Sequence, residues 1–288
     1  MIAFIIAFRH PESTKNYAKV VKLLDNTLLT LTNQTDQNFM VYIGCNIQPN
    51  VSVSSPKIKY CCIDCPLPAN RREVLLDRGV KRSAAIKFAM QDCAPDLIFM
   101  LDADDLVSKN CVDTLNKLSV TDKSGGYWLE CGYLLDVANA KVQEKFGFNR
   151  FCGSSLVFNA ALLAQQLFGN VLDTEKLQTY GDYMDACDQE VMAELIGDHA
   201  VARTYMLSIN RPMQRLLSAM VCWKINTGEN ESRTQIPFGS KKISRQFLEE
   251  FSIIDVPERK ASMAEQVVER LRYFRSMIAT LLLSKNKN

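Results

Sequence analysis

Two aspartates separated by one residue, Asp102 and Asp104, have the spacing that most directly suggests chemistry in this sequence. In an extended segment, side chains two residues apart share a face, so both carboxylates can converge on one hard cation. Mg²⁺ or Mn²⁺ binds through oxygen ligands and commonly completes its shell with water and substrate phosphates. A divalent ion held here would bridge the two phosphates of a nucleoside diphosphate and stabilise that group as it departs. Because Asp-x-Asp is also common in solvated turns, the surrounding elements matter.

The first hundred residues alternate short apolar runs with helical patterns, which predicts βαβ units and a largely parallel sheet. Strands are expected at 2–8, 39–45, 57–63 and 96–101, and helices at 13–32 and 79–90. The fourth strand runs directly into Asp102. Ligands of open α/β sheets bind outside the carboxyl ends of parallel strands. The acidic pair therefore stands where a ligand is expected.

The rest of the chain reads as mainly helical. We expect a helix from about Lys109, strands at 127–135 and 151–158, helices at 160–168, 188–196, 212–225, 244–251 and 258–283, and one late strand at 203–209. A polar, turn-rich stretch at 226–242 is the best boundary. The predicted fold class is α/β, a Rossmann-like and mostly parallel sheet flanked by helices over 1–235, followed by a helical C-terminal extension at 236–288.

Taken with its strand, the segment 97–105 resembles the DxD region of bacterial-type family 2 glycosyltransferases of the GT-A fold. Other segments agree in the same order: 2–10 looks like the first strand and nucleotide-contacting loop, 31–35 resembles the "SLxxQT" helix ending, 79–85 the "GxxxARNxG" helix start, 153–158 the acceptor-side "GxxxxF" strand, 187–190 the "ED" pair, and 227–232 a "TGENxS" element. Each motif is loose, but their order over residues 1 to 235 is more specific than any one of them.

The resemblance implies a nucleotide-sugar-binding half at 1–105 and an acceptor half at 106–235. It further implies inverting transfer of a sugar from a nucleotide-diphosphate-sugar, with a UDP-sugar as the first guess, to a hydroxyl of a saccharide or lipid-linked acceptor. Mn²⁺ or Mg²⁺ would be held by Asp102 and Asp104. The donor-binding positions carried over are Phe8, Arg9, His10, Asn46, Lys81, Arg82, Asp102, Ala103 and Asp104, and the acceptor-side positions are Gly153, Ser154 and Ser155.

A carboxylate must take the proton from the incoming hydroxyl, and Asp188 matches the family's base, with Glu190 as the second choice. Asp188 also stands where it would cap the expected helix at 188–196, and a residue at a helix start can serve both purposes. Arg82 and Lys81 could pair with donor phosphates through charge-assisted hydrogen bonds, Arg82 with bidentate geometry. A solvated helix face is the alternative for Lys81.

Other readings remain open. A haloacid-dehalogenase-type phosphatase also uses Asp-x-Asp but places it at the first strand, and a nucleotidyltransferase would carry a Gly-rich loop where residues 9–12 have no glycine. A non-catalytic relative that binds a sugar, a nucleotide or a partner protein is a further alternative. The intact Asp102, Asp104 and Asp188 argue against it, whereas the second strand's turn, Gly44-Cys45-Asn46-Ile47, leaves room for it because it lacks the acidic residue usual in the family. The segment before Thr227 lacks the histidine that some members carry, so a metal held by fewer protein ligands would bind weakly without a donor.

Composition limits the classes further. A formal net charge of +2 gives no electrostatic argument for a nucleic-acid partner. Ten cysteines without a second metal-ligand pair favour reduced thiols over zinc or disulfides. No apolar run reaches the roughly 18 to 20 residues of a spanning helix, so we expect a cytoplasmic protein. The basic, amphipathic pattern at 258–287 allows peripheral contact with the inner face of a membrane, packing on the body, or a dimer contact.

Overall fold

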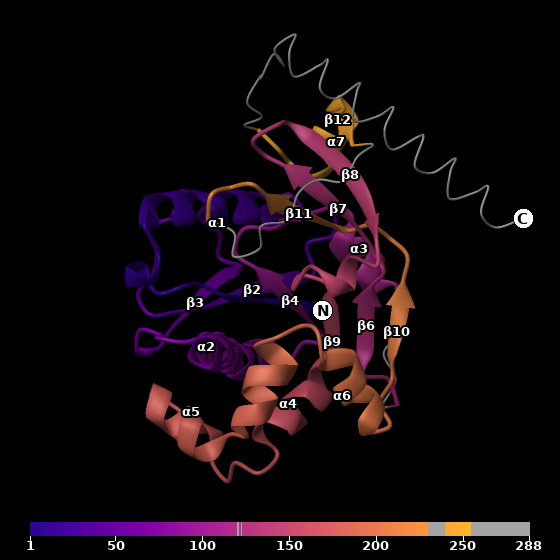
Figure 1. Cartoon of the computed structure of the whole chain (residues 1–288). Coiled ribbons are helices and arrows are strands. Elements are labelled where there is room, and N and C mark those ends of the chain that lie inside the picture. Colours follow the sequence, from indigo (N-terminus) through magenta and orange to yellow (C-terminus); the bar gives the residue numbers. More distant parts are fainter. Residues whose placement is uncertain (120, 122, 230–239, 255–288) are drawn as a thin grey trace, which may run out of the picture.

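The computed structural model describes residues 1–119, 121, 123–229 and 240–254. Within these residues a seven-stranded sheet forms the centre of the molecule (Figure 1). Its strands, in spatial order, are β10 (Met213–Leu216), β6 (Gly126–Leu129), β9 (Leu156–Asn159), β4 (Leu97–Asp102), β1 (Ile2–Ala7), β2 (Phe39–Cys45) and β3 (Ile58–Cys62). All neighbouring strands are parallel except β9, which runs antiparallel to both β4 and β6.

Helices cover both faces of this sheet. The helical elements are η1 (Pro11–Ser13), α1 (Tyr17–Thr32), α2 (Arg71–Asp92), α3 (Cys111–Asn116), η2 (Phe148–Arg150), α4 (Ala160–Phe168), η3 (Thr174–Lys176), α5 (Tyr180–Ala186), the π-helix η4 (Val191–Ile196), α6 (Ala202–Ser208) and α7 (Arg245–Glu250). In Figure 1, α1 lies above the sheet, and α2, α4 and α6 lie below it. The α/β class predicted from the sequence, a mostly parallel sheet flanked by helices, is confirmed.

The alternation of side chains along β1 explains the two-sided core. Phe4 and Ile6 pack on the α1 side, where the Phe4 ring stacks on Phe99 at 5.3 Å between centroids. Ala3 and Ile5 point to the opposite side, toward α2 and α4. A parallel strand with both faces covered is expected to be apolar throughout, and the β1 residues are buried almost completely.

Among the described residues, a second, five-stranded sheet is formed by strands that follow β4 in the sequence. Its strands are, in order, β12 (Lys241–Lys242), β8 (Lys141–Phe146), β7 (Cys131–Asp136), β11 (Val221–Ile225) and β5 (Leu106–Val107). β8 was not predicted, because its polar, alternating residues lack the apolar density of the other strands. The predicted strand at 127–135 is divided into β6 and β7 at Glu130.

Several predicted elements of the second half are wrong. The helix expected at 212–225 is β10 and β11, and the strand expected at 203–209 is the helix α6. Short apolar runs fit both the strand and the helix period, so the sequence alone does not distinguish the two. Residues 212–225 form strands because β10 pairs with β6 and β11 pairs with β7. α2 begins eight residues before the predicted start because Asn70 caps it, its side chain accepting from the Glu73 amide.

The C-terminal prediction is covered only in part. The expected helix at 244–251 is present as α7, and Phe251 is buried against the second sheet. The expected helix at 258–283, residues 230–232 of the "TGENxS" element and most of the 236–288 extension lie outside the described residues. Among the described residues, no helix has both the length and the apolar character required to cross a bilayer.

Candidate active site

The point where the sheet reverses its direction of growth lies between β1 and β4. From β1 the chain moves outward to β2 and β3, then returns through α2 to place β4 on the other side of β1. Ala7, the last residue of β1, pairs with Asp102, the last residue of β4. Ligands of open α/β sheets bind at such a switch point, outside the carboxyl ends of the strands. The fold therefore brings Asp102 to the position where a ligand is expected.

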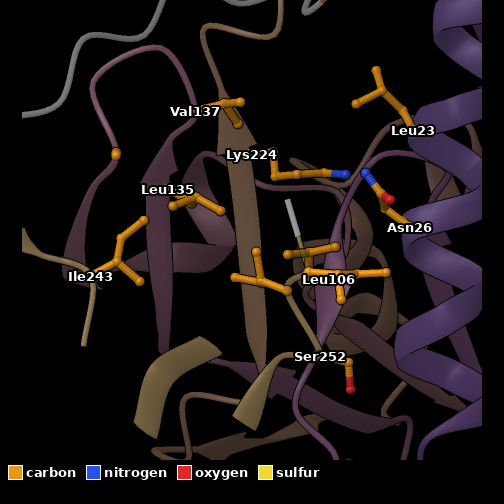
Figure 2. A pocket seen from close by; sticks show the side chains of 11 residues that line it. Leu23, Asn26, Leu106, Leu135, Val137, Lys224, Ile243 and Ser252 are labelled. Carbon is orange, nitrogen blue, oxygen red and sulfur yellow. The ribbon is translucent and has the colours of Figure 1, made fainter. Parts of the chain in front are cut away.

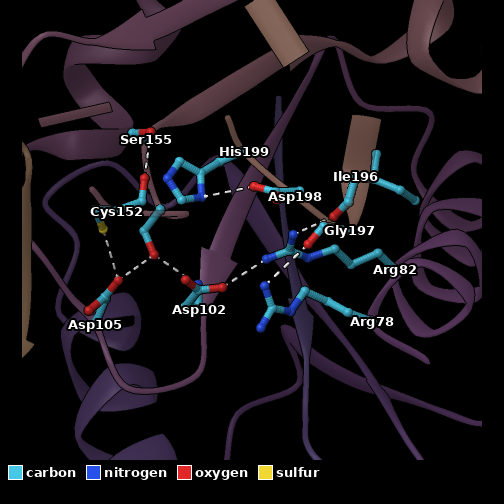
Figure 3. Close-up of polar contacts among 11 residues, drawn as sticks. Arg78, Arg82, Asp102, Asp105, Cys152, Ser155, Ile196, Gly197, Asp198 and His199 are labelled. Carbon is cyan, nitrogen blue, oxygen red and sulfur yellow. Dashed lines mark hydrogen bonds and ion pairs between the residues drawn. The ribbon is translucent and has the colours of Figure 1, made fainter. Parts of the chain in front are cut away.

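Asp102 is held from two sides at this edge (Figure 3). Its Oδ1 accepts a hydrogen bond from Nη2 of Arg82 at 2.9 Å, and its backbone amide donates to Oγ of Ser154 at 2.8 Å. A Cβ on Gly153 would lie 2.6 Å from Asp102 Oδ2, so only glycine leaves room for this carboxylate. The Asp102 side chain is still 33% exposed. It is fixed in place and yet accessible to a ligand.

Basic residues from α2 surround Asp102. Arg82 is 4% exposed, and its Nη1 donates to the carbonyl of Ile196, while Nη1 of Arg78 donates to the carbonyl of Gly197 at 3.2 Å. Burial would raise the pKa of Asp102, but the charges of Arg82 and Arg78 outweigh it and hold that pKa below its ordinary value. Burial lowers the pKa of Arg82 to about 10, so it remains cationic at neutral pH.

Asp104 lies in a charged setting of its own. Burial and the neighbouring charge of Asp102 raise the pKa of Asp104, whereas the charges of Lys224 and Arg9 lower it. Lys224 projects from β11 and is 4% exposed. The Asp102 charge raises the free energy of the ionised Asp104 carboxylate, and an added cation would offset this effect.

Asp105 has a structural role. Its Oδ2 accepts from Oγ of Ser154 at 2.5 Å and from Sγ of Cys152 at 3.3 Å, and the carboxylate is 1% exposed. Ser154 Oγ thus joins Asp105 to the Asp102 amide, and Oγ of Ser155 donates to the Cys152 carbonyl at 2.7 Å. Of the predicted acceptor-side residues, Gly153 and Ser154 therefore lie directly against the acidic segment, whereas the Ser155 side chain contacts Cys152.

The predicted donor residues after β1 line the neighbouring loop. Arg9 lies 3.9 Å from the Glu229 carboxylate, and Oγ1 of Thr14 donates to the same carboxylate at 2.9 Å. His10 accepts from the Glu12 amide through Nδ1 and so caps η1. The described part of the "TGENxS" element thus contacts the loop that follows β1 through Glu229.

Other predicted donor residues serve the framework. Phe8 is 1% exposed and its amide donates to the Gly44 carbonyl at 2.8 Å. Asn46 donates to the Cys65 carbonyl at 2.7 Å, and the Ala103 carbonyl accepts from Thr27 at 3.0 Å. These contacts fix the loops after β2 and β4.

Lys81 is completely buried, and its Nζ lies 2.7 Å from the Asp77 carboxylate. In this conformation its ammonium is committed to a neighbour on its own helix, so a contact with donor phosphates stays a prediction. Arg82, likewise buried, contacts Asp102 and would reach a donor phosphate only by leaving it.

The predicted base precedes η4. Oδ1 of Asp188 accepts from the amides of Glu190 at 2.8 Å and Val191 at 3.2 Å, so Asp188 caps this helix. Glu190 is exposed and pairs with Arg72 at 2.5 Å. η4 ends at Ile196, the residue that contacts Arg82, so Asp188 lies at the opposite end of η4 from the Asp102 site. The cap is observed, and the role as base stays a prediction.

A small hollow lies between α1 and the second sheet (Figure 2). Its walls are largely apolar and include Leu23, Leu106 and Leu135. The side chains of Lys224 and Asn26 point toward each other at one end. Such a lining does not suit a diphosphate, so the hollow is not the predicted donor site.

The acidic pair fits a divalent cation that takes its remaining ligands from water and phosphate. Among the described residues, no group of three or more His, Cys, Asp or Glu side chains is arranged to hold a metal. Asp102 and Asp104 would then be two carboxylate ligands, and such sites commonly depend on a bound phosphate group. We therefore expect metal affinity to be weak without a nucleotide.

Sequence reasoning missed two residues beside Asp102. His199 lies near enough for its charge to lower the pKa of Asp102, and its Nδ1 is 3.7 Å from the Asp198 carboxylate. Arg78 lies one turn before Arg82 on α2. An i, i+4 pair of arginines on the helix that follows β3 was a usable signal for Arg78. His199 could not be placed, because η4 and the residues after it lack a clear period.

Comparisons with known proteins give limited information. No protein-family model matches the sequence, and no curated protein matches it significantly. Similar solved structures include S. aureus TarS 1–349 (12% identity, 77% of this chain and 60% of that chain, TM-score 0.39), galactosyltransferase LgtC in complex with donor and acceptor sugar analogues (14%, 90% and 98%, 0.40), and the apo-form glycosyltransferase GlyE of Streptococcus pneumoniae TIGR4 (13%, 96% and 63%, 0.32).

The chain thus spans 60% of the length of the TarS portion. The TM-scores are too low for any of these likenesses to carry an argument about this chain. Its function is therefore argued from its own residues.

Proposed function

We propose that this protein is a glycosyltransferase that moves a sugar from a nucleotide-diphosphate-sugar to an acceptor hydroxyl. One observation carries the proposal: Asp102 ends β4 beside the end of β1, at the switch point of the sheet, with Asp104 two residues later. A mostly parallel sheet with an acidic pair at this place suits a nucleoside diphosphate and its counter-ion. The order of the family 2 motifs along the sequence gives independent support.

On the donor side, Asp102 and Asp104 would hold Mn²⁺ or Mg²⁺, which supplies positive charge for the departing diphosphate. Arg82 keeps the Asp102 carboxylate ionised and oriented through its 2.9 Å contact. Arg9 and His10, in the loop after β1, would lie on the nucleotide side. A UDP-sugar is the first donor to test.

On the acceptor side, Gly153 and Ser154 border the acidic segment, and a saccharide or lipid-linked acceptor would approach near them. The side chains of Ser154 and Ser155 are fully buried, so they would support this segment without touching the acceptor. Asp188 would take the acceptor proton in an inverting displacement, with Glu190 as the second candidate. A cytoplasmic location, with possible peripheral contact at the inner membrane face, accompanies this proposal.

A non-catalytic protein that binds a sugar, a nucleotide or a partner is the second candidate. Two observations favour it: one Asp102 oxygen is already paired with Arg82, and Asp188 is engaged as a helix cap. Such a protein would bind a nucleotide without releasing a nucleoside diphosphate.

The test is a panel of nucleotide-sugars in a thermal unfolding assay with Mn²⁺, on the wild type and on Asp104→Ala. A ligand that binds only the folded state raises its stability with the logarithm of the ratio of ligand concentration to Kd, by about 2.7 kcal/mol when that ratio is one hundred. We expect a metal-dependent shift for one nucleotide family that Asp104→Ala removes. The matched control, Asp113→Ala, changes a partly exposed aspartate on α3 that pairs with Lys117, and it should keep the shift. A panel without any shift would contradict the donor site, and a shift without turnover would favour the second candidate.

A further inference from the structure

Two cysteine side chains lie in contact at the β3 edge of the seven-stranded sheet (Figure 1). Cys45 is the last residue of β2, and Cys62 is the last residue of β3. The two residues are partners in the register of these parallel strands, and their Sγ atoms are 3.8 Å apart. Both are free thiols. The strand pairing therefore holds two reduced sulfur atoms side by side.

The geometry of the paired strands suits a bond between these sulfur atoms. Neighbouring strands are about 4.7 to 4.9 Å apart, which is within the Cα separations of roughly 4.4 to 6.8 Å that disulfides show. Cys61 also lies close by in the sequence, but successive side chains of a strand point to opposite faces. Cys61 packs on the α2 side of the sheet, whereas Cys45 packs on the α1 side. The register therefore favours a bond from Cys45 to Cys62 over one to Cys61.

The two thiols differ in their access to solvent. Cys62 is exposed on the edge strand, whereas Cys45 has no exposed surface. Burial, together with the neighbouring Cys62, raises the pKa of Cys45, so its thiol is protonated at neutral pH. An oxidant in solution therefore meets Cys62 first, and Cys45 is positioned to react with the product.

Metal binding explains this pair less well. A structural zinc site takes four ligands, commonly cysteine and histidine. Among the described residues, no group of three or more His, Cys, Asp or Glu side chains is placed to hold a metal. The chemistry that two thiols in contact can perform without a further ligand is the formation of a disulfide.

We propose that Cys45 and Cys62 form a redox-sensitive pair, which hydrogen peroxide converts to a disulfide that joins the ends of β2 and β3. The Cys62 thiolate attacks a peroxide oxygen, the O–O bond breaks, and Cys62 becomes a sulfenic acid. The hydroxide that leaves takes up the proton that the Cys62 thiol had lost. The Cys45 sulfur then attacks the Cys62 sulfur, the S–O bond breaks, and the second hydroxide leaves as water with the Cys45 proton. Two electrons pass from the thiols to the peroxide, which is reduced to two molecules of water.

The bond changes the edge of the sheet. It shortens the distance between the sulfur atoms from 3.8 Å to about 2.05 Å. Because β2 lies between two strands and β3 lies at the edge, we expect the end of β3 to move. The bond also connects residues 17 positions apart, and such a link restricts the unfolded chain and stabilises the fold. This inference does not depend on the proposed donor site.

The test treats the reduced full chain with a small molar excess of hydrogen peroxide and maps its peptides without reduction. We expect one pair of peptides joined through Cys45 and Cys62, lighter by two hydrogen atoms than the separate peptides, which dithiothreitol separates again. In Cys45→Ala, Cys62 should stop at the sulfenic acid, which dimedone traps. The matched control is Cys61→Ala, which removes the neighbouring thiol on the opposite face and should form the bond as the wild type does.

Thermal unfolding of the same samples gives a second measurement. Oxidation should raise the Tm of the wild type by about 5 °C and leave the Tm of Cys62→Ala unchanged. Cys62 is exposed, so this variant keeps the test independent of how well Cys45→Ala folds. Oxidation of Cys62 without a bond to Cys45, a disulfide that uses Cys61 instead, or an equal rise in Tm for Cys62→Ala would each overturn the proposal.

Discussion

The contact between Arg82 and Asp102 gives the sharpest structural prediction. Replacing Arg82 by methionine removes a buried guanidinium and leaves Asp102 without its 2.9 Å partner. Loss of one member of a buried pair costs roughly 3 to 5 kcal/mol. Because the Asp102 side chain is 33% exposed and solvent can replace part of the contact, we expect about 2 to 3 kcal/mol, or a fall in Tm of roughly 5 to 10 °C.

The pH dependence follows from the direction of the shift. The pKa of Asp102 in the folded protein lies below its ordinary value of about 3.9, so its ionised form stabilises the fold above that value. The contribution is lost as the pH falls through the lower, folded pKa. The difference in Tm between the wild type and Arg82→Met should therefore be largest at neutral pH and should decrease as the pH falls below the ordinary pKa of Asp102.

The assay is thermal unfolding followed by circular dichroism, with two comparisons. Arg71→Met removes an arginine whose side chain is 79% exposed and lies 3.6 Å from Asp198, so it should cost less than about 1 kcal/mol. Adding Asp102→Asn to Arg82→Met removes the uncompensated charge and should restore part of the loss. Equal Tm values for Arg82→Met and Arg71→Met, or no recovery in the double variant, would refute the reasoning.

Two further predictions concern other residues near the site. In Gly153→Ala the new methyl group would lie 2.6 Å from the Asp102 carboxylate, so metal-dependent nucleotide binding should weaken about tenfold or more. In the control Gly181→Ala the nearest atom to the new methyl group, Oγ1 of Thr179, would lie 3.7 Å away, so the affinity for nucleotide and metal measured by titration calorimetry should not change. Equal affinities for Gly153→Ala and Gly181→Ala would contradict the close packing of Gly153 on Asp102. All ten cysteines lie within the described residues, and Cys62 is the exposed one. Cys62 should therefore react first with a thiol reagent. Burial raises the pKa of Cys65 to about 12, so the Cys65 thiol should react slowly at neutral pH. Peptide mapping that finds Cys65 labelled as fast as Cys62 would count against the burial of Cys65.

The first half of the fold could be predicted because its strands are fully buried and separated by long helices. β2 was predicted at its observed bounds, and β1 and β4 to within a residue or two at each end. The start of α2 was missed, because the apolar residues within 71–78 form one consecutive run, Val74–Leu76, and not a stripe at helical period, so only the Asn70 cap marks the beginning. β10 and β11 could not be distinguished from a helix by period, since each is a short run completed by pairing with distant strands.

The candidate site was predictable to the extent that it follows one strand end. Asp102 was placed correctly at the end of β4. Ser154 was predicted only as an acceptor-side residue, and its contact with the Asp102 amide was not predicted. The burial of Lys81 and the Arg82–Asp102 contact were not predictable, because helix periodicity does not say which face meets the sheet edge. Asp188 was expected to cap a helix start and does so, whereas its place relative to Asp102 depends on the path of η4.

The most direct test of the central claim measures Mn²⁺ binding by the loss of the free-ion electron paramagnetic resonance signal, with and without UDP. Because Asp102 and Asp104 would be joined by phosphate oxygens in holding the ion, Mn²⁺ should bind weakly alone and at least tenfold more tightly with UDP. Asp102→Asn and Asp104→Asn should each abolish the UDP-dependent increase. If UDP leaves Mn²⁺ affinity unchanged, or if the variants bind the pair as the wild type does, the acidic pair is not a metal–diphosphate site and the glycosyltransferase proposal loses its foundation.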